Sequence, residues 1–189
     1  MELTLSRDSP TNTLILDAGG TPLYHICTPF KWTRRTTTIF RGGPSMRSPD
    51  SSVPPDPASS SLDGSTISPD SSEIARIHWN YVDSPRLVYD GRIVEFSKFM
   101  PAGGFMWMTR TFTAPDGKSY IWRMGWGSCH LELNDGSKPA KLIARFKEAN
   151  LLKGSKSILE IDEAGLHILD LIVITWVFVE KYRRDGESK

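Results

Sequence analysis

Cysteine is scarce in this chain: Cys27 and Cys129 are the two cysteines among 189 residues. Two cysteines make no disulfide framework, so we expect free thiols in a reducing compartment. The first ten residues, MELTLSRDSP, lack the apolar run of a signal peptide, and the sequence lacks an Asn-x-Ser/Thr glycosylation site. These absences argue against secretion and predict a cytoplasmic protein, with the nucleus or the periphery of a membrane as alternatives.

A strong net charge is also missing. The 23 basic and 22 acidic residues give a formal charge of +1, so no field of the whole protein would recruit nucleic acid, and no such partner is expected. The Gly-x-Ser-x-Gly motif of hydrolases and glycine-rich phosphate loops before a helix are absent. Asp90 and Asp116 stand in turn sequences rather than as an acid–base pair. The sequence predicts a non-catalytic protein without a cofactor.

Metal-ligating residues are few. His25 and Cys27 would share one face of a strand, and Cys129 with His130 could complete a four-ligand zinc site. Adjacent residues on a strand point to opposite faces, however, so Cys129 and His130 could not both bind one ion without a bulge. We expect packed thiols and hydrogen-bonded histidines here, and no metal.

The chain has one dense hydrophobic run, Leu166 to Tyr182, which reads LHILDLIVITWVFVEKY. Its polar residues His167, Asp170, Thr175 and Glu180 scatter around a helical wheel and form no stripe. A helix that is apolar on all sides must be buried on every side. The run therefore predicts a C-terminal helix enclosed by the rest of the fold.

Two alternatives to the buried helix remain open at this point. The β-branched residues of the run favour a strand, although its length without a turn residue favours a helix. A membrane anchor with a basic flank is the second alternative. Its uninterrupted apolar part, Leu171 to Val179, is short against the roughly 20 residues that span a bilayer, and Asp170 stands at its edge.

Short segments of alternating polarity, separated by turn sequences, precede this run and indicate an all-β barrel or sandwich. A barrel of about twelve strands leaves a hole, and one helix, about 10–12 Å across, would fill it. We therefore predict a mainly β fold, a barrel around the C-terminal helix. The expected strands are Leu3–Leu5, Leu14–Leu16, Pro22–Thr28, Thr33–Arg41, Ile74–Trp79, Arg86–Tyr89, Arg92–Phe96, Thr109–Ala114, Ser119–Met124, His130–Leu133, Lys141–Phe146 and Ser157–Ile161.

Residues 43–72 differ in composition from the rest of the chain. They contain eleven serines, six prolines and four aspartates. Such a segment buries too little apolar surface to offset its ordering entropy, so we predict a disordered insert. The expected organisation is one barrel domain formed by residues 1–42 and 73–184, with residues 185–189 as a tail.

Several sequence stretches carry a resemblance to known proteins over nearly the whole chain outside residues 43–72. They are Asn12–Leu14, Gly20, Leu23–Ile26, Ile74–Trp79, Arg110–Gly117, Tyr120–Arg123, Ala144–Phe146 and Leu169–Lys181. With these stretches, the chain resembles an uncharacterised family of basidiomycete fungi, known as a domain of unknown function. In architecture it is similar to the tubby C-terminal-like fold of tubby proteins, phospholipid scramblases and plant LURP-one-related proteins.

A cluster of basic residues, Lys31, Arg34, Arg35 and Arg41, surrounds one expected strand and is interleaved with aromatic residues. Such side chains can hold a phosphorylated headgroup, and the resemblance to tubby proteins implies phosphoinositide binding on a basic face. A solvated strand face that keeps a sheet edge soluble is the alternative.

A run of large apolar residues, Phe105 to Met108, follows Gly103 and Gly104. It could form an exposed tip that enters a bilayer, or at least half of it could fill the core. Together with the basic cluster, this favours peripheral binding of anionic phospholipid, and we expect a monomer. A scaffold for protein partners, without lipid binding, is the alternative function.

Overall fold

The computed structural model describes residues 1–29, 35–43, 72–80, 84–105, 108–149 and 154–187. The strands in these ranges form one thirteen-stranded antiparallel sheet in the order β7-β6-β5-β4-β3-β2-β1-β13-β12-β11-β10-β9-β8. Except at the β1–β13 pair, sheet neighbours are also sequence neighbours. The bounds are β1 Glu2–Leu5, β2 Thr13–Leu16, β3 Pro22–Cys27, β4 Arg35–Arg41, β5 Ser72–Trp79, β6 Arg86–Tyr89, β7 Arg92–Glu95, β8 Ala102–Gly103, β9 Thr109–Thr113, β10 Ser119–Gly125, β11 Ser128–Leu133, β12 Leu142–Lys147 and β13 Ile158–Ile161.

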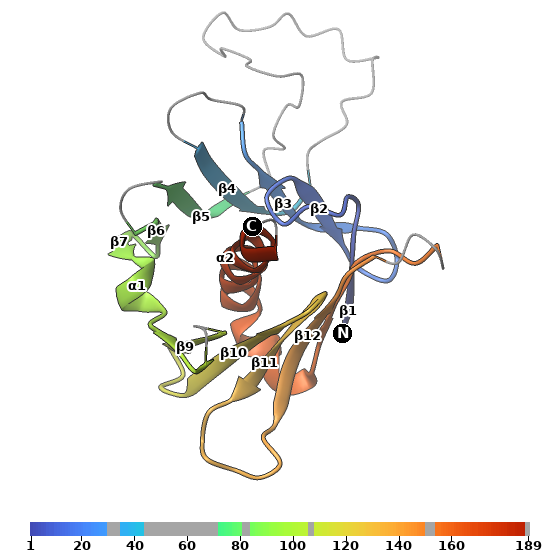
Figure 1. Ribbon diagram of the computed structural model, residues 1–189. Helices are drawn as coiled ribbons and strands as arrows, with labels where there is room; N and C mark the ends of the chain where they lie inside the picture. Colours follow the sequence, from blue (N-terminus) through green and yellow to red (C-terminus); the bar gives the residue numbers. More distant parts are fainter. Residues whose placement is uncertain (30–34, 44–71, 81–83, 106–107, 150–153, 188–189) are drawn as a thin grey trace, which may run out of the picture.

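The sheet curls around a central helix, α2 (Leu169–Glu187), as Figure 1 shows. The mainly β fold with a buried C-terminal helix is thus confirmed. The sheet is not a closed barrel, because the two end strands, β7 and β8, do not pair with each other. The twelve expected strands are present, and the thirteenth is the two-residue β8.

The seam between β7 and β8 is bridged by a short helix, α1 (Phe96–Phe99), which the sequence analysis did not predict. The Phe96 ring is fully buried and stacks on Phe178 of α2 with 4.0 Å between centroids. Phe99 stacks on Phe112 of β9 at 6.2 Å. Aromatic side chains therefore close the core where backbone hydrogen bonds do not.

The strands follow the period of two that their sequences predict. In β3, Tyr24 and Ile26 are buried while His25 and Cys27 are less covered. In β4, Thr37 and Ile39 are fully buried, and neighbouring residues face outward. The inward-facing side chains of all these strands make one apolar core with the helix at its centre.

Helix α2 is buried around its whole circumference, since every residue from Leu171 to Glu180 is buried. The helix excludes the strand alternative for this run. It begins later than predicted: Glu163–Ile168 form a 3-10 helix, which is capped by Asp162 through a bond from the Ala164 N–H at 3.0 Å. Inside the barrel, Thr175 donates to the Leu171 carbonyl at 2.7 Å and accepts from Trp122 at 2.9 Å, so this buried hydroxyl is satisfied.

A polar cluster around Asp116 lies at the N-terminal end of α2. Asp116, in the β9–β10 turn, accepts from Tyr120 at 2.7 Å and lies 2.8 Å from His167 Nε2. Partial burial would raise the pKa of Asp116, but the bonds from His167, Tyr120 and the Lys118 N–H outweigh it and lower this pKa to about 2. His167 thereby links the β9–β10 turn to the 3-10 helix that precedes α2.

The C-terminal end of α2 contains a buried ion network. Glu180 is fully buried and accepts from Arg183 at 2.6 Å and from Arg184 at 2.6 Å. Arg183 also donates to Glu148 at 3.0 Å and to Glu187 at 2.6 Å. The bond to Glu180 raises the pKa of Arg183 against the effect of burial. These bonds compensate charges that would otherwise be costly inside the protein.

The predicted tail and the predicted insert can each be compared in part with the described residues. Helix α2 continues through Glu187, which is three residues into the predicted tail. Of the predicted insert, residues 44–71 lie outside the described residues; Ser72 belongs to β5, and Gly43 packs on Pro22.

The enclosed helix predicts that small truncations inside it are costly. Ile172→Ala and Ile174→Ala should each lower the free energy of unfolding by about 2–5 kcal/mol, because both side chains are fully buried and leave cavities. Urea denaturation measures this. Ile93→Ala is the matched control, since Ile93 is 70% exposed, and it should change stability by less than about 0.5 kcal/mol. Equal small effects at all three positions would contradict the enclosed helix.

The Asp116 cluster predicts a component of acid sensitivity. The folded-state pKa of about 2 lies below the ordinary value of 3.8, so the ionised carboxylate stabilises the fold above about pH 4, and this stabilisation is lost as the pH falls through about 2. Asp116→Asn should lower stability near neutral pH and flatten its decline between these values.

Chemical denaturation across acidic pH makes the comparison. The control is Asp90→Asn, which removes a turn aspartate that the described residues leave without a side-chain hydrogen bond. It should keep the wild-type slope. A wild-type slope in Asp116→Asn would show that the cluster does not contribute.

Candidate functional site

Of the predicted basic cluster, the structure describes Arg35 and Arg41 and separates these two. Lys31 and Arg34 lie outside the described residues. Arg35 and Arg41 are the first and last residues of β4, so they stand at opposite ends of the barrel. Arg41 forms an ion pair with Asp170, whose other oxygen accepts from the Tyr24 hydroxyl at 2.7 Å. Arg41 therefore belongs to the attachment of the N-terminal end of α2, whereas Arg35 remains a candidate for binding.

Arg35 lines a groove of about 510 Å³ beside the C-terminal end of α2. The groove also contains the cations Lys181 and Arg184 from the helix. Two carboxylates face them: Asp185 lies 2.6 Å from Lys181, and Asp8 lies 2.7 Å from Arg184. The remaining lining is Trp79 together with the loop residues 9–12 and 28–29.

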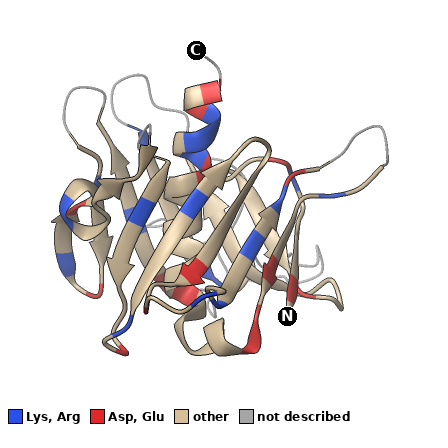
Figure 2. Cartoon of the chain, turned by 60° about the horizontal axis from the view of Figure 1, so that its bottom comes forward, with Lys and Arg blue, Asp and Glu red and all other residues tan. Residues whose placement is uncertain are grey.

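The last turns of α2 project beyond the strands and bring their basic side chains to this end of the molecule (Figure 2). The Lys181 ammonium lies 5.2 Å above the Trp79 ring. Trp79 is paired in register with Arg35 across β4 and β5, which places the groove beside the end of the helix. Three cations against two carboxylates make the groove mildly basic, and its volume lies within the range of small-ligand sites, roughly 300–1,000 Å³.

Two strongly exposed aromatic side chains lie at the same end of the barrel. Phe105 precedes β9 and is 86% exposed, and Trp126, in the β10–β11 turn, is 89% exposed. Their loops are neighbours, because the Met124 N–H donates to the Met108 carbonyl and the Met108 N–H donates to that of Phe105. The Gly127 N–H lies 3.5 Å from Glu187 at the end of α2. We call Phe105 and Trp126 the aromatic tips.

The structure describes two residues of the segment 105–108, for which an exposed tip or core packing was predicted. Phe105 and Met108 are exposed, so these two do not fill the core. Met106 and Trp107 lie outside the described residues. Trp126 was not predicted as a tip, although a tryptophan between two glycines in a hairpin turn is an available signal.

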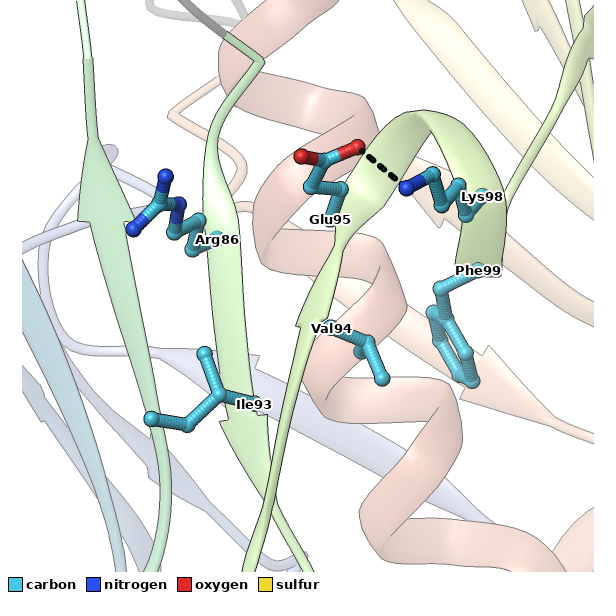
Figure 3. Close-up of a pocket in the computed structure, with 6 residues that line it drawn as sticks. All are labelled: Arg86, Ile93, Val94, Glu95, Lys98 and Phe99. Carbon is cyan, nitrogen blue, oxygen red and sulfur yellow. Dashed lines mark ion pairs between the residues drawn. The ribbon is translucent and has the colours of Figure 1, made fainter.

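A second groove, of about 540 Å³, follows the open seam of the sheet (Figure 3). Val94 and Phe99 fill the space between β7 and α1, and Glu95 points toward Lys98 at 3.2 Å. Ile93 stands on the edge strand and is 70% exposed. With its carboxylate paired and no nucleophile in its lining, this groove offers an apolar contact rather than a catalytic group.

The zinc alternative finds no support in the described residues, which contain no group of three or more His, Cys, Asp or Glu side chains suited to a metal. His25 stacks on Phe40 at 5.9 Å between centroids. Cys129 is fully buried beside Glu180, and burial together with that carboxylate raises the pKa of its thiol well above the ordinary value. A thiol of this kind is a poor nucleophile.

Within the described residues, no helix has the length and apolar content needed to cross a bilayer. Comparison with curated proteins and comparison with solved structures each give no match. Residues 8–185, nearly the whole chain, match a family described as a family of unknown function (DUF6593). The chain therefore belongs to the DUF6593 family.

Proposed function

We propose that this protein is a non-catalytic module that binds anionic phospholipid headgroups at a membrane surface. The binding face is the end of the barrel at which α2 terminates. The observation that carries the proposal is the presence, at that one end, of the aromatic tips and of the basic groove beside Arg35. The opposite end, by contrast, uses its polar residues in the Asp116 and Asp170 clusters.

The aromatic tips fit the boundary between lipid and water. Burying a Phe-sized side chain contributes about 1.5–3 kcal/mol of transfer free energy. The exposed tryptophan and phenylalanine lack this contribution in water, and insertion between acyl chains would supply it. Tryptophan is particularly suited to the interface because its ring is apolar and its N–H can stay hydrated. Side chains on hairpin turns can reach the interface without a change in the sheet.

The cations supply the second attraction. Each lysine or arginine near an anionic leaflet contributes about 1 kcal/mol. One weak anchor gives marginal, reversible binding, and two signals together give stable attachment. In the groove, Lys181 and Arg184 already have carboxylate partners, so Arg35 is the cation that we assign to the headgroup.

The proposal extends to the predicted residues that the structure does not describe. Lys31 and Arg34 are close in sequence to Arg35 and to Pro29, which lines the groove, and we keep them as proposed headgroup-binding residues. We further propose that the fold is tubby-like and that the protein is fungal. The enclosed helix and the antiparallel strands support this relation, as do the sequence stretches that resemble the fungal family.

The alternative, a scaffold for protein partners without lipid binding, is favoured by a different feature. The outer edge of β7 is unpaired, and Ile93 beside it is largely exposed. An extended peptide can add a strand to such an edge. Loss of an interaction after a change in Ile93, with vesicle binding absent, would support this function instead.

The lipid proposal predicts that the aromatic tips are needed for binding. Wild-type protein should sediment with vesicles of phosphatidylcholine that contain about 20% phosphatidylserine, and weakly with phosphatidylcholine alone. Trp126→Ala combined with Phe105→Ala should reduce the bound fraction at least about tenfold, because two interfacial side chains are lost. The matched control is Ile93→Ala, which removes an exposed apolar side chain at the seam and should bind like wild type.

The same assay tests the assignment of Arg35. Arg35→Glu should weaken binding to the anionic vesicles, whereas Arg92→Glu, an equal charge change in the β6–β7 hairpin at the other end, should not. Wild-type binding should also decrease with salt, since the screening length shortens from about 10 Å at 0.1 M to 3 Å at 1 M. Wild-type protein that ignores anionic vesicles at low salt would contradict the proposed function.

A further inference from the structure

A buried arginine without a carboxylate partner lies close to the aromatic tips. Arg110, the second residue of β9, is 8% exposed. Its guanidinium carbon lies 4.6 Å from the centroid of the Tyr182 ring and 5.6 Å from that of Phe178. Its Nε atom is buried and has no hydrogen-bond partner in the described structure. None of the ion pairs among the described residues includes it.

Arg183 is also buried, but its surroundings differ from those of Arg110. Arg183 is surrounded by three carboxylates, those of Glu148, Glu180 and Glu187. At Arg110, burial lowers the pKa of the guanidinium, and the Tyr182 side chain opposes this in part. A buried cation without an anion is costly in a folded protein. Two aromatic faces offset some of that cost by cation–π attraction, but they supply no negative charge.

Arg110 lies near the open seam of the sheet and near the projecting end of α2. It pairs in register with Ala102 of β8, the edge strand at the open seam, so one two-residue strand lies between it and the free edge. Tyr182, which forms one wall of its site, is 44% exposed at the projecting end of α2. The guanidinium therefore lies just beneath the face that carries the aromatic tips.

We propose that Arg110 coordinates a phosphate group of the bound phospholipid, in addition to the headgroup contact assigned to Arg35. This inference rests on the proposed function and names a binding residue for it. A guanidinium presents parallel N–H donors to two oxygens of a phosphate, and the partial exclusion of water strengthens such charged hydrogen bonds. The rings of Tyr182 and Phe178 lie against the guanidinium, and their apolar surfaces exclude water from it. The phosphate supplies the negative charge that the described protein does not provide.

The stability of a variant without the Arg110 charge shows whether the guanidinium serves ligand binding or the fold. Arg110→Met keeps much of the side-chain volume and removes the buried charge. If the charge serves a ligand, this variant should unfold at the same temperature as wild type or at a higher one in phosphate-free buffer, because replacing an unpaired buried charge by an apolar side chain is neutral or favourable. A melting temperature lower by several degrees would assign the guanidinium to the fold and overturn the inference.

Binding is tested with two sources of phosphate. Wild-type protein should show a melting temperature that rises with added glycerol 3-phosphate, and it should sediment with phosphatidylcholine vesicles that contain about 20% phosphatidic acid. Arg110→Met should lose the glycerol 3-phosphate response and bind those vesicles about tenfold more weakly. Arg110→Lys, which keeps the charge without the planar donors, should fall between the two.

The outcomes distinguish this inference from the proposed function. Vesicle binding that is equal in wild type and in both Arg110 variants would overturn the role of Arg110 and leave the membrane proposal intact. An Arg110-dependent response to glycerol 3-phosphate without vesicle binding would support the phosphate site and identify a soluble ligand as its source. The absence of both responses in the wild type would overturn both.

Discussion

The fold depends on one constraint: a helix that is apolar around its whole circumference must be covered on every side. Leu171 to Glu180 are all buried, and the antiparallel sheet covers them by curling into a nearly complete barrel (Figure 1). Where β7 and β8 fail to pair, Phe96 and Phe99 of α1 complete the cover with side chains. The helix thus determines the curvature of the sheet and the place of its seam.

The same constraint makes the two ends of the barrel different. At the N-terminal end of α2, Asp170 and Asp116 bind side chains from the strands and turns, so the polar groups there hold the fold together. At the C-terminal end, a buried carboxylate, Glu180, neutralises the helix arginines from within. The surface at this end of the barrel carries the exposed aromatic tips and Arg35. The functional proposal follows from this asymmetry.

Local sequence patterns predicted the helix and the strands, but they did not predict the contacts that hold these elements together. The helical wheel of Leu166 to Tyr182 predicted a buried helix, and the period of two predicted each longer strand. The pair of Arg41 and Asp170 is separated by 129 positions, and no local period encodes it. The open seam escaped prediction because β8 has two residues and no pattern. Arg110 could have been found, since it alternates with Phe112 on the inward face of β9.

The end of the barrel that we propose to face the membrane can be tested by quenching of tryptophan fluorescence with brominated phospholipids in anionic vesicles. Bromine atoms on the acyl chains quench a tryptophan that enters the bilayer. Trp122 and Trp176 are fully buried and should be insensitive, whereas Trp126 is 89% exposed at the proposed face. We predict quenching in the wild type that decreases in Trp126→Phe, and Trp79, which lines the groove at the same end, accounts for the remainder. Vesicle-bound protein whose fluorescence is unquenched, or is quenched equally in Trp126→Phe, would contradict this prediction.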